Sequence, residues 1–412
     1  MSGGNTSAAR RKNIEIAMIQ EDFDVEQFMN KYETGIKYNL GETCVDSMSI
    51  KDIIKFFPED EQQSVEKQLH DEVFNMKLVY GWIEGSDELK TNIAKIYNED
   101  NKSELKVTKE NIIITNGAIG ANFLCFYTLI NPGDKIIAVE PSYQQLTSVP
   151  NVFSDGNLVK FPILDSEGYQ PDLDKLKLLI NQHKPKMLII NNPNNPTGYL
   201  WNNDQIAEII DICKSNDMYI MCDEVYRPLY HSSTNPPTSI VNFGYKKTLS
   251  TGSMSKAFSF AGLRLGWIVS HDDSLIKDLA SKRDYNTISI SMIDDKFSSF
   301  ILSNYKKILA RNYVICQNNL KQIDNFIEES KGLITWIRPV AGTTAFIKFN
   351  DNLITMDLSI ELAEKHKVLM VPGECFQYPG YARVGFGNSV EDIKGGLEVL
   401  KNVLIEKGVW KH

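Results

Sequence analysis

Short apolar runs alternate along the chain with longer segments in which apolar residues recur every three or four positions. The apolar runs predict buried strands at 111–116, 134–140, 186–191, 218–224 and 264–270. The periodic segments predict helices at 117–130, 171–183 and 204–216, with Pro171 in the first turn of its helix. Strands that are apolar throughout and alternate with helices predict an α/β fold, in which a mostly parallel sheet is covered by helices on both faces.

The pattern changes after about residue 295. Helical periodicity dominates at first, and it is followed by a strand at 345–349, a helix at 357–366, a strand at 367–371 and the apolar stretch 382–387. This order predicts a second, smaller α+β domain. We therefore expect three regions: a tail and a segment joining the small domain at 1–48, a large domain at 49–294, and a small C-terminal domain at 295–412.

Composition and charge exclude several classes of protein. The net charge of −9 over 412 residues argues against a bulk electrostatic hold on nucleic acid or on an anionic membrane. The polar first thirteen residues do not form a secretory signal, and no apolar run approaches the ~20 residues that span a bilayer. None of the six cysteines forms a C-x-x-C pair, which favours buried reduced thiols and a cytoplasmic location. No metal site is predicted.

Polar residues gather where predicted strands end, which is where parallel sheets bind ligands. "NGAIG" (116–120) opens a helix whose first amides would bind phosphate, although close packing explains small residues there equally well. Asp223 would cap a turn or hold a cationic ring nitrogen, and Tyr143 would be a half-buried aromatic or stack on a flat cofactor. "NNPNNPTG" (191–198) forms a rigid turn that also fixes amide side chains.

The stretch "SMSKAFSFAGLRLG" (253–266) surrounds Lys256 with small residues and places Arg264 eight positions later. A lysine becomes a nucleophile when desolvation or a nearby cation such as Arg264 deprotonates its amine. Small neighbours would admit a bulky anionic ligand. A solvated loop lysine is the alternative for this stretch taken alone.

Seven motifs stand in one order along the chain: "YGWIEGSDELK", "NGAIG", "EPSY", "NNPTG", "CDEVY", "SMSKAFSFAGLRLG" and "ARVGFG". In these motifs the chain resembles the fold-type I pyridoxal-phosphate (PLP) enzymes of the class I/II aminotransferase superfamily, from about Leu40 to the C-terminus. The resemblance implies the PLP-dependent transferase fold, with a mixed, mostly parallel sheet in the large domain.

The resemblance also implies roles for individual residues. Catalytic roles fall to Lys256, which would bind PLP covalently, and to Asp223 and Tyr226. The phosphate and ring of PLP would be held by Gly117, Ala118, Ile119, Tyr143, Asn195, Asp223, Tyr226, Ser253, Lys256 and Arg264. The substrate would be bound by Arg383, which would clamp the α-carboxylate, and by Asn195, Gly41 and Trp82. Tyr80 would reach the phosphate of a neighbouring subunit, which implies a homodimer with shared active sites.

The resemblance implies the activity of an aminotransferase. Such an enzyme moves the amino group of an L-α-amino acid to a 2-oxo acid by a ping-pong mechanism, and 2-oxoglutarate is the acceptor expected here. A PLP-dependent lyase or a cyclase of the capreomycidine-synthase kind is an alternative because it shares the cofactor residues. A PLP-binding regulatory protein is a further alternative. The substrate pocket is expected to include Glu42, 81–85 and 283–291. A dicarboxylate would need a second cation, for which Arg227 and Arg283 are candidates, whereas Glu84 would suit a basic substrate.

Overall fold

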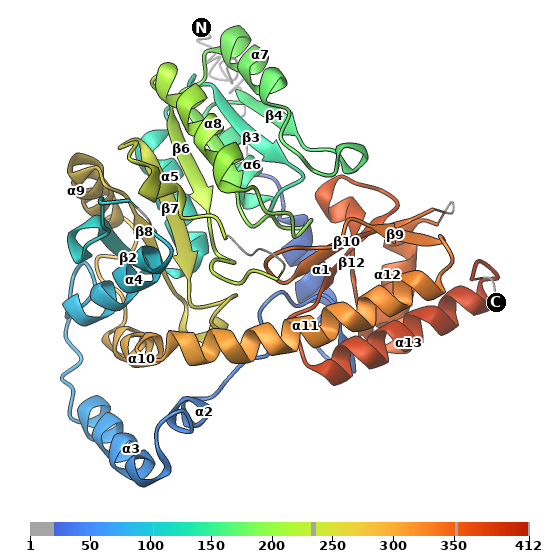
Figure 1. Ribbon diagram of the computed structural model, residues 1–412, viewed down its shortest axis with the longest axis horizontal. Helices are drawn as coiled ribbons and strands as arrows, with labels where there is room; N and C mark the ends of the chain where they lie inside the picture. Colours follow the sequence, from blue (N-terminus) through green and yellow to red (C-terminus); the bar gives the residue numbers. More distant parts are fainter. Residues whose placement is uncertain (1–19, 102, 232–235, 351–352, 411–412) are drawn as a thin grey trace, which may run out of the picture.

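A seven-stranded sheet forms the centre of the larger part of the molecule in the computed structural model, which describes residues 20–101, 103–231, 236–350 and 353–410 (Figure 1). Its strands lie in the order β2 (Ile112–Asn116), β8 (Leu265–Val269), β7 (Thr248–Ser253), β6 (Tyr219–Asp223), β5 (Met187–Asn191), β3 (Ile136–Glu140) and β4 (Leu158–Pro162). Strand β8 is antiparallel to both of its neighbours, and all other pairs are parallel. The predicted mixed, mostly parallel sheet is confirmed.

Helices cover both faces of this sheet because its strands carry apolar side chains on both sides. Along β5, Leu188 and Ile190 belong to one hydrophobic core, and Met187 and Ile189 belong to the other. The first core also contains residues of α4 (Asp87–Glu99), α7 (Leu173–His183) and α8 (Asn203–Ser215). The second contains residues of α5 (Gly117–Leu129), α6 (Gln145–Phe153) and α9 (Asp273–Arg283).

Helix α7 begins later than predicted. Its cap is Asp172, whose side chain accepts a hydrogen bond from the backbone N–H of Lys175. Pro171 therefore lies just before the helix, and its prediction within the first turn is wrong. The other predicted helices and strands of this part are confirmed to within a residue or two at their ends.

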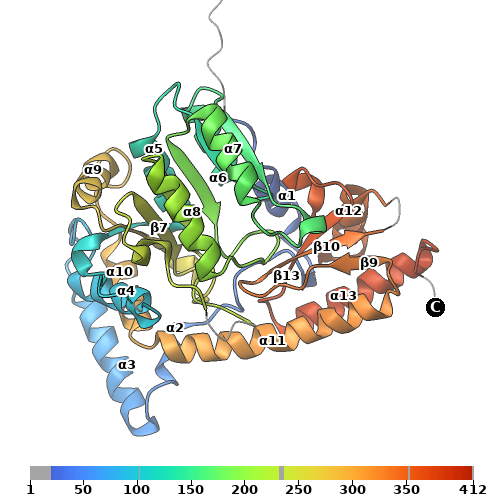
Figure 2. The same ribbon diagram turned by 45° about the horizontal axis from the view of Figure 1, so that its top comes forward.

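The smaller part is built on a four-stranded antiparallel sheet in the order β12 (Val371–Pro372), β13 (Tyr381–Gly385), β10 (Thr344–Phe349) and β9 (Ile334–Trp336). Helices α11 (Tyr305–Glu329) and α12 (Thr355–His366) contact this sheet, and α13 (Val390–Glu406) packs against α11. The long helix α11 runs below both parts in Figures 1 and 2. The predicted smaller α+β unit is confirmed as an antiparallel sheet with helices.

The strand predicted at 367–371 is two strands in two different sheets. β11 (Val368–Leu369) pairs in parallel with β1 (Tyr38–Asn39), and only the following Val371–Pro372 joins the antiparallel sheet. The β1–β11 pair ties the N-terminal segment to the C-terminal elements. The domain boundaries stay a prediction, and the one at 294/295 falls within α10 (Met292–Leu302).

In the described part of the chain, three helices come before α4: α1 (Asp24–Tyr32), α2 (Ile50–Ile54) and α3 (Glu59–Phe74). Helix α1 packs against β12 and its neighbouring turn, whereas α3 projects away from the body of the molecule (Figures 1 and 2). Short 3₁₀ helices are found at η1 (Lys109–Asn111), η2 (Asp165–Glu167), η3 (Ile240–Phe243), η4 (Ala261–Leu263) and η5 (Gly373–Phe376). In the described ranges no helix has the length and hydrophobicity needed to cross a membrane.

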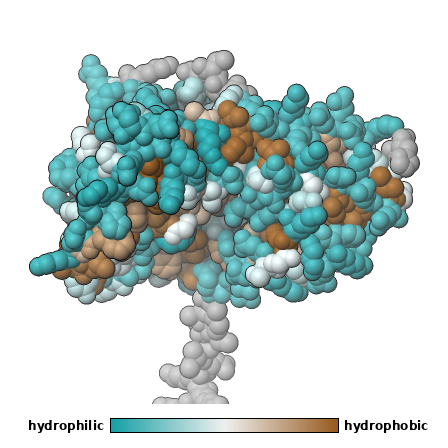
Figure 3. All heavy atoms as spheres, turned by 90° about the horizontal axis from the view of Figure 1, so that it is seen from below, coloured by the Kyte–Doolittle hydropathy of each residue, from teal (hydrophilic) through white to brown (hydrophobic). Residues whose placement is uncertain are grey.

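Apolar side chains are exposed at the end of α3 and in the loop that follows it. Phe74, Leu78, Val79 and Tyr80 are each between 67% and 76% exposed, and neighbouring exposed apolar residues of this kind are typical of interaction surfaces. Figure 3 shows hydrophobic side chains reaching the surface in patches on an otherwise largely hydrophilic face. In a single copy of the chain, these apolar side chains are thus exposed to solvent.

Candidate active site

A cavity of about 520 Å³ lies at the carboxyl ends of β5, β6 and β7, and it also reaches β13 of the smaller sheet. The predicted site residues that line it are Gly41, Ala118, Ile119, Tyr143, Asn195, Asp223, Tyr226, Ser253, Lys256, Arg264 and Arg383. Tyr80 and Trp82 do not line the cavity of their own chain; they are 70% and 42% exposed. Gly117 lies just behind the lining, at the start of α5.

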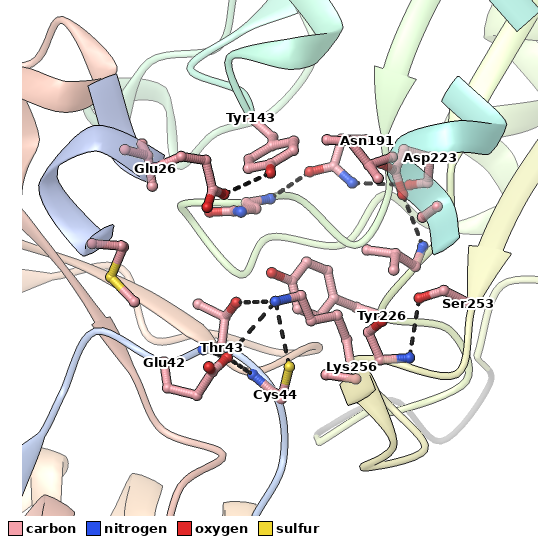
Figure 4. A pocket seen from close by; sticks show the side chains of 18 of the residues that line it. Glu26, Glu42, Thr43, Cys44, Tyr143, Asn191, Asp223, Tyr226, Ser253 and Lys256 are labelled. Carbon is pink, nitrogen blue, oxygen red and sulfur yellow. Dashed lines mark hydrogen bonds and ion pairs between the residues drawn. The ribbon is translucent and has the colours of Figure 1, made fainter. Parts of the chain in front are cut away.

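Lys256 reaches the middle of this cavity from the loop after β7 (Figure 4). Its Nζ donates to Thr43 Oγ1 at 2.7 Å and lies 3.5 Å from Cys44 Sγ and 3.8 Å from Glu42 Oε1. Burial lowers the pKa of the Lys256 ammonium, but the neighbouring Cys44 and Glu42 outweigh burial, so this pKa lies above its ordinary value. The expectation of an amine deprotonated by Arg264 is wrong for the ligand-free protein, because its charged neighbour is an acid.

Glu42 is held in its ionised form beside this lysine. Its Oε1 accepts hydrogen bonds from the backbone amides of Thr43 and Cys44, both at 2.6 Å. Burial raises its pKa, but Lys256 and these hydrogen bonds outweigh burial and lower the pKa to about 2. Glu42 therefore carries a negative charge at neutral pH.

Asp223 ends β6 and is buried beneath the cavity. Its carboxylate accepts hydrogen bonds from Asn122 Nδ2 at 2.9 Å and from the backbone N–H of Val225 at 3.0 Å. Asn122 is itself fixed by Thr251, whose hydroxyl donates to its amide oxygen at 2.7 Å. Burial raises the pKa of Asp223 to about 6, against the opposing effect of these hydrogen bonds. A cation placed next to this carboxylate would be strongly favoured.

The start of α5 meets the ends of β7 and β8 at one side of the cavity. Gly117 has φ +69°, and Arg264 also adopts the left-handed region with φ +50°. Gly266 permits the close approach, because a Cβ there would lie only 2.6 Å from the backbone nitrogen of Ala118. The free amides at the start of a helix, the guanidinium of Arg264 and the hydroxyl of Ser253 together form a site suited to a phosphate group.

Arg383 of β13 approaches from the opposite side. It is only 3% exposed; its Nη2 donates to the Gly41 carbonyl at 3.0 Å and its Nη1 lies 3.5 Å from Asn195 Oδ1. Within the described ranges, its Nε and the buried hydroxyl of Tyr226 have no hydrogen-bond partner. Buried polar atoms are normally paired, so two unpaired groups at one cavity indicate that a ligand completes them.

These features fit the cofactor that the sequence resemblance implies. Arg264, Ser253 and the start of α5 suit the phosphate of PLP, Asp223 suits its ring nitrogen, and the unpaired hydroxyl of Tyr226 suits its 3-oxygen. Tyr143 also lines the cavity, but its hydroxyl donates to Glu26 Oε1 at 2.9 Å.

Two arginines proposed as a second substrate cation point elsewhere. Arg227 donates to Tyr230 Oη at 2.9 Å and pairs with Asp100 at 3.5 Å. Arg283 donates to backbone carbonyls, including Ile114 O at 3.0 Å. Neither lines the cavity, so both expectations are wrong. Glu84 also lies outside the cavity of its own chain, and its carboxylate is 3.7 Å from Lys90 Nζ, so its role toward a basic substrate stays a prediction.

Sequence reasoning missed the acids Glu26 of α1 and Glu33 directly after it, which do line the cavity, and it also missed Asn122. Val25, Phe28 and Tyr32 are buried at helical spacing in α1, and this pattern was the signal for the helix. An amide within the apolar segment 117–130 was the corresponding signal for Asn122.

Comparisons with known proteins agree with this geometry. The sequence model of the family "Aminotransferase class I and II" matches residues 42–400. Capreomycidine synthase from Streptomyces vinaceus is 27% identical over 293 residues, covering 71% of this chain and 74% of that protein. Aspartate aminotransferase from Thermotoga maritima is 27% identical over 335 residues, covering 78% and 82%.

Solved structures give the same result. A PLP-dependent aminotransferase from Streptococcus suis matches with a TM-score of 0.86 at 33% identity, over 96% of this chain and all of that one. The PLP-dependent cyclase OrfR matches with a TM-score of 0.82 at 21% identity, over 95% of this chain and all of that one, which is a likeness of fold.

Proposed function

Because this chain belongs to the aminotransferase class I and II family, whose enzymes use PLP, we propose that it transfers the amino group of an L-α-amino acid to a 2-oxo acid by a ping-pong mechanism. One observation carries the proposal. The amine of Lys256 stands in a single cavity with the buried carboxylate of Asp223 and the buried guanidinium of Arg383. An amine, a carboxylate and a guanidinium are the groups that this reaction needs.

When bound, PLP supplies an aldehyde that reacts with amines and a pyridine ring that withdraws electrons from the substrate α-carbon. Asp223 would keep the ring nitrogen protonated, because an adjacent cation would offset the cost of burying the charge of this carboxylate. Tyr226 donates its unpaired hydroxyl to the ring oxygen. Arg264 and Ser253 hold the phosphate, together with the first amides of α5.

Lys256 moves the proton. With the cofactor bound, its amine would take the proton from the substrate α-carbon and hold it at Nζ until it is passed on. Thr43, whose hydroxyl lies 2.7 Å from Nζ, keeps the amine at the centre of the cavity between the two transfers. Arg383 binds the substrate α-carboxylate and so fixes which face of the α-carbon Lys256 meets.

A half-reaction distinguishes transamination from other PLP chemistry. Holoenzyme incubated with amino acid alone should release about one equivalent of 2-oxo acid per site and then stop. Adding a second 2-oxo acid, with 2-oxoglutarate and pyruvate tested separately, should restore turnover. Continuous release of ammonia without any acceptor would contradict an aminotransferase and identify a lyase.

A cyclase or lyase on the same scaffold is the second candidate. The likeness to capreomycidine synthase favours it, as does the cavity itself. The only cations among its described lining residues are Lys256, Arg264 and Arg383, which leaves none for the second carboxylate of 2-oxoglutarate. A cyclised amino acid product with no 2-oxo acid released would establish this candidate.

We further propose a homodimer with shared active sites, located in the cytoplasm as six free, buried cysteines suggest. Ile119 lines the cavity and also an adjoining apolar groove with Phe123, Tyr127 and Tyr285, so apolar surface reaches the edge of the site. Tyr80, exposed in a single chain, would reach the phosphate of the partner's site.

Mixing two inactive variants tests the shared site. In a hybrid of Lys256→Ala and Tyr80→Ala subunits, one site carries both defects and the other carries neither. If Tyr80 acts across the interface, mixed and re-equilibrated subunits should recover about a quarter of wild-type activity. Each variant re-equilibrated with itself is the control. Absence of recovery in proven hybrids would show that Tyr80 acts within its own chain or not at all.

A further inference from the structure

We infer that the amino acid substrate carries a positive charge on its side chain, and that Glu26, Glu33 and Glu42 recognise this charge. The inference rests on the proposed function, because it takes the cavity to bind an α-amino acid. It names the class of substrate: an α-amino acid that ends in an ammonium or guanidinium group.

The three acids occupy one end of the cavity. Glu26 belongs to α1, Glu33 follows this helix directly, and Glu42 lies in the segment after β1; all three line the cavity. Figure 4 shows Glu26 and Glu42 on one side of the Lys256 amine, with Asp223 and Ser253 on the other. The cofactor side and the acidic side are therefore separate regions, and a substrate bound next to Lys256 faces the acids.

The charges along the cavity do not balance without a further cation. Each cation that lines the cavity already has a partner in the proposed function. Arg264 binds the phosphate, Lys256 binds the cofactor and Arg383 binds the substrate α-carboxylate. Asp223 is matched by the ring nitrogen. The three glutamates are then left facing a substrate side chain, so a neutral side chain leaves them uncompensated and an anionic one adds repulsion.

Two of these acids are fixed in place, and the third is free to adjust. The Glu42 carboxylate is held by two backbone amides, and that of Glu26 by the hydroxyl of Tyr143. Glu33 is exposed, and no hydrogen bond or ion pair of its carboxylate is found among the described residues. Burial raises the pKa of Glu33, and so do the charges of Glu42 and Glu26, so a ligand cation would relieve a mutual repulsion.

The clamp for the α-carboxylate lies beside the first acid. Arg383 Nη2 is bonded to the carbonyl of Gly41, and Glu42 is the next residue. The buried Arg383 Nε, unpaired among described residues, shows independently that a polar ligand belongs here. An amino acid held by Arg383 thus has its charged end groups next to one guanidinium and several carboxylates.

The test compares substrates that differ in charge and little in shape. Holoenzyme is assayed with L-arginine against L-citrulline and with L-lysine against L-norleucine, and L-glutamate serves as the anionic case. We expect kcat/KM for the cationic member of at least one pair to exceed that of its neutral partner about tenfold or more. Raising ionic strength should reduce this ratio, because part of the site is open to solvent.

Glutamine substitutions connect this preference to the named residues. Glu33→Gln should reduce the cation-to-neutral ratio about two- to fivefold, which is typical for a partly exposed charge. Glu26→Gln combined with it should reduce the ratio about tenfold. Glu66→Gln, on the outer surface of α3, is the matched control and should leave the ratio unchanged.

The outcomes separate the inference from the proposed function. An active enzyme that handles neutral partners as well as cationic ones, or whose preference survives the double substitution, overturns the inference and leaves the proposed function standing. If no amino acid is turned over, calorimetric binding of arginine and citrulline to the holoprotein decides the matter. Tighter binding of arginine that Glu33→Gln weakens supports the inference even though the proposed function fails; equal binding overturns it.

Discussion

Replacing Asp223 by Asn should change how the stability of the cofactor-free protein depends on pH. This carboxylate is 3% exposed, and the groups that bond it are an amide and a backbone N–H. Burial raises its pKa to about 6 from an ordinary 3.8. The folded protein therefore binds the Asp223 proton more tightly than the unfolded chain does, so ionising this group opposes folding.

The size of the effect follows from these two values. The difference between a pKa of 3.8 and one of about 6 corresponds to about 3 kcal/mol, present in full below the unfolded pKa and lost as pH rises through the folded pKa. About 2 kcal/mol of it should be lost between pH 4.5 and 7.5, because part of the titration lies below this window. Asn has the same shape, retains one acceptor and does not titrate.

Urea unfolding measures the effect. Wild type and Asp223→Asn, both freed of cofactor, are compared at several pH values between 4.5 and 7.5. The free energy of unfolding of wild type relative to the variant should fall by about 2 kcal/mol across this range. Asp60→Asn, on the exposed surface of α3, controls for a general change of charge. Parallel pH profiles for wild type and Asp223→Asn would refute the reasoning. Bound PLP should reverse the order, because its ring nitrogen stabilises the ionised form.

Four further substitutions test the site. Lys256→Ala should retain PLP without a covalent bond while turnover falls ~10³-fold or more, which dialysis and steady-state rates would measure; near-normal turnover would exclude Lys256. Arg383→Lys should lower kcat/KM about ten- to a hundredfold for every amino acid and leave PLP content unchanged; lost PLP would place Arg383 at the cofactor. Tyr226→Phe should stabilise the cofactor-free protein by about 1 kcal/mol and weaken PLP binding, since its hydroxyl is buried and unpaired among described residues; lower stability would reveal a partner. Gly266→Ala should lower Tm and phosphate affinity, because its Cβ would lie 2.6 Å from Ala118 N; an unchanged affinity for PLP would show that α5 does not bind its phosphate.

The strands of the large sheet were predictable because each is a continuous apolar run between polar turns. In β5, alternate residues enter two different cores, so no polar position interrupts the run. The segment 367–371 shows the limit of this reasoning. It is equally apolar, but Val368 pairs with Tyr38, which is far from it in sequence, whereas Val371 pairs with Arg383 in a different sheet.

Within the site, residues carried by motifs were predictable and residues brought in by tertiary packing were not. Lys256, Asp223 and Arg383 lie in ordered motifs, and all three line the cavity. Glu26 reaches the same cavity from a helix more than a hundred residues away from its partner Tyr143. Position in sequence also failed to indicate where an arginine points: both Nη atoms of Arg283 donate to backbone carbonyls outside the cavity.

One segment connects the two sides of the cavity, so their functions are not independent. Residues 40–45 contact the smaller sheet through Gly385, whose backbone N–H donates to the Leu40 carbonyl at 2.8 Å, and the larger part through the carbonyl of Lys256, which accepts from Val45 at 3.3 Å. A Cβ at Gly385 would lie 2.7 Å from the carbonyl carbon of Glu42, so this strand must pass directly against the segment. The same few residues hold the Lys256 amine through Thr43 and the Arg383 guanidinium through Gly41. Any displacement of the smaller sheet that moves Arg383 therefore also moves the groups around Lys256, because no flexible linker lies between them. Residues 40–45, which include Glu42, therefore couple two events. One is the binding of a substrate carboxylate to Arg383, and the other is the positioning of the Lys256 amine.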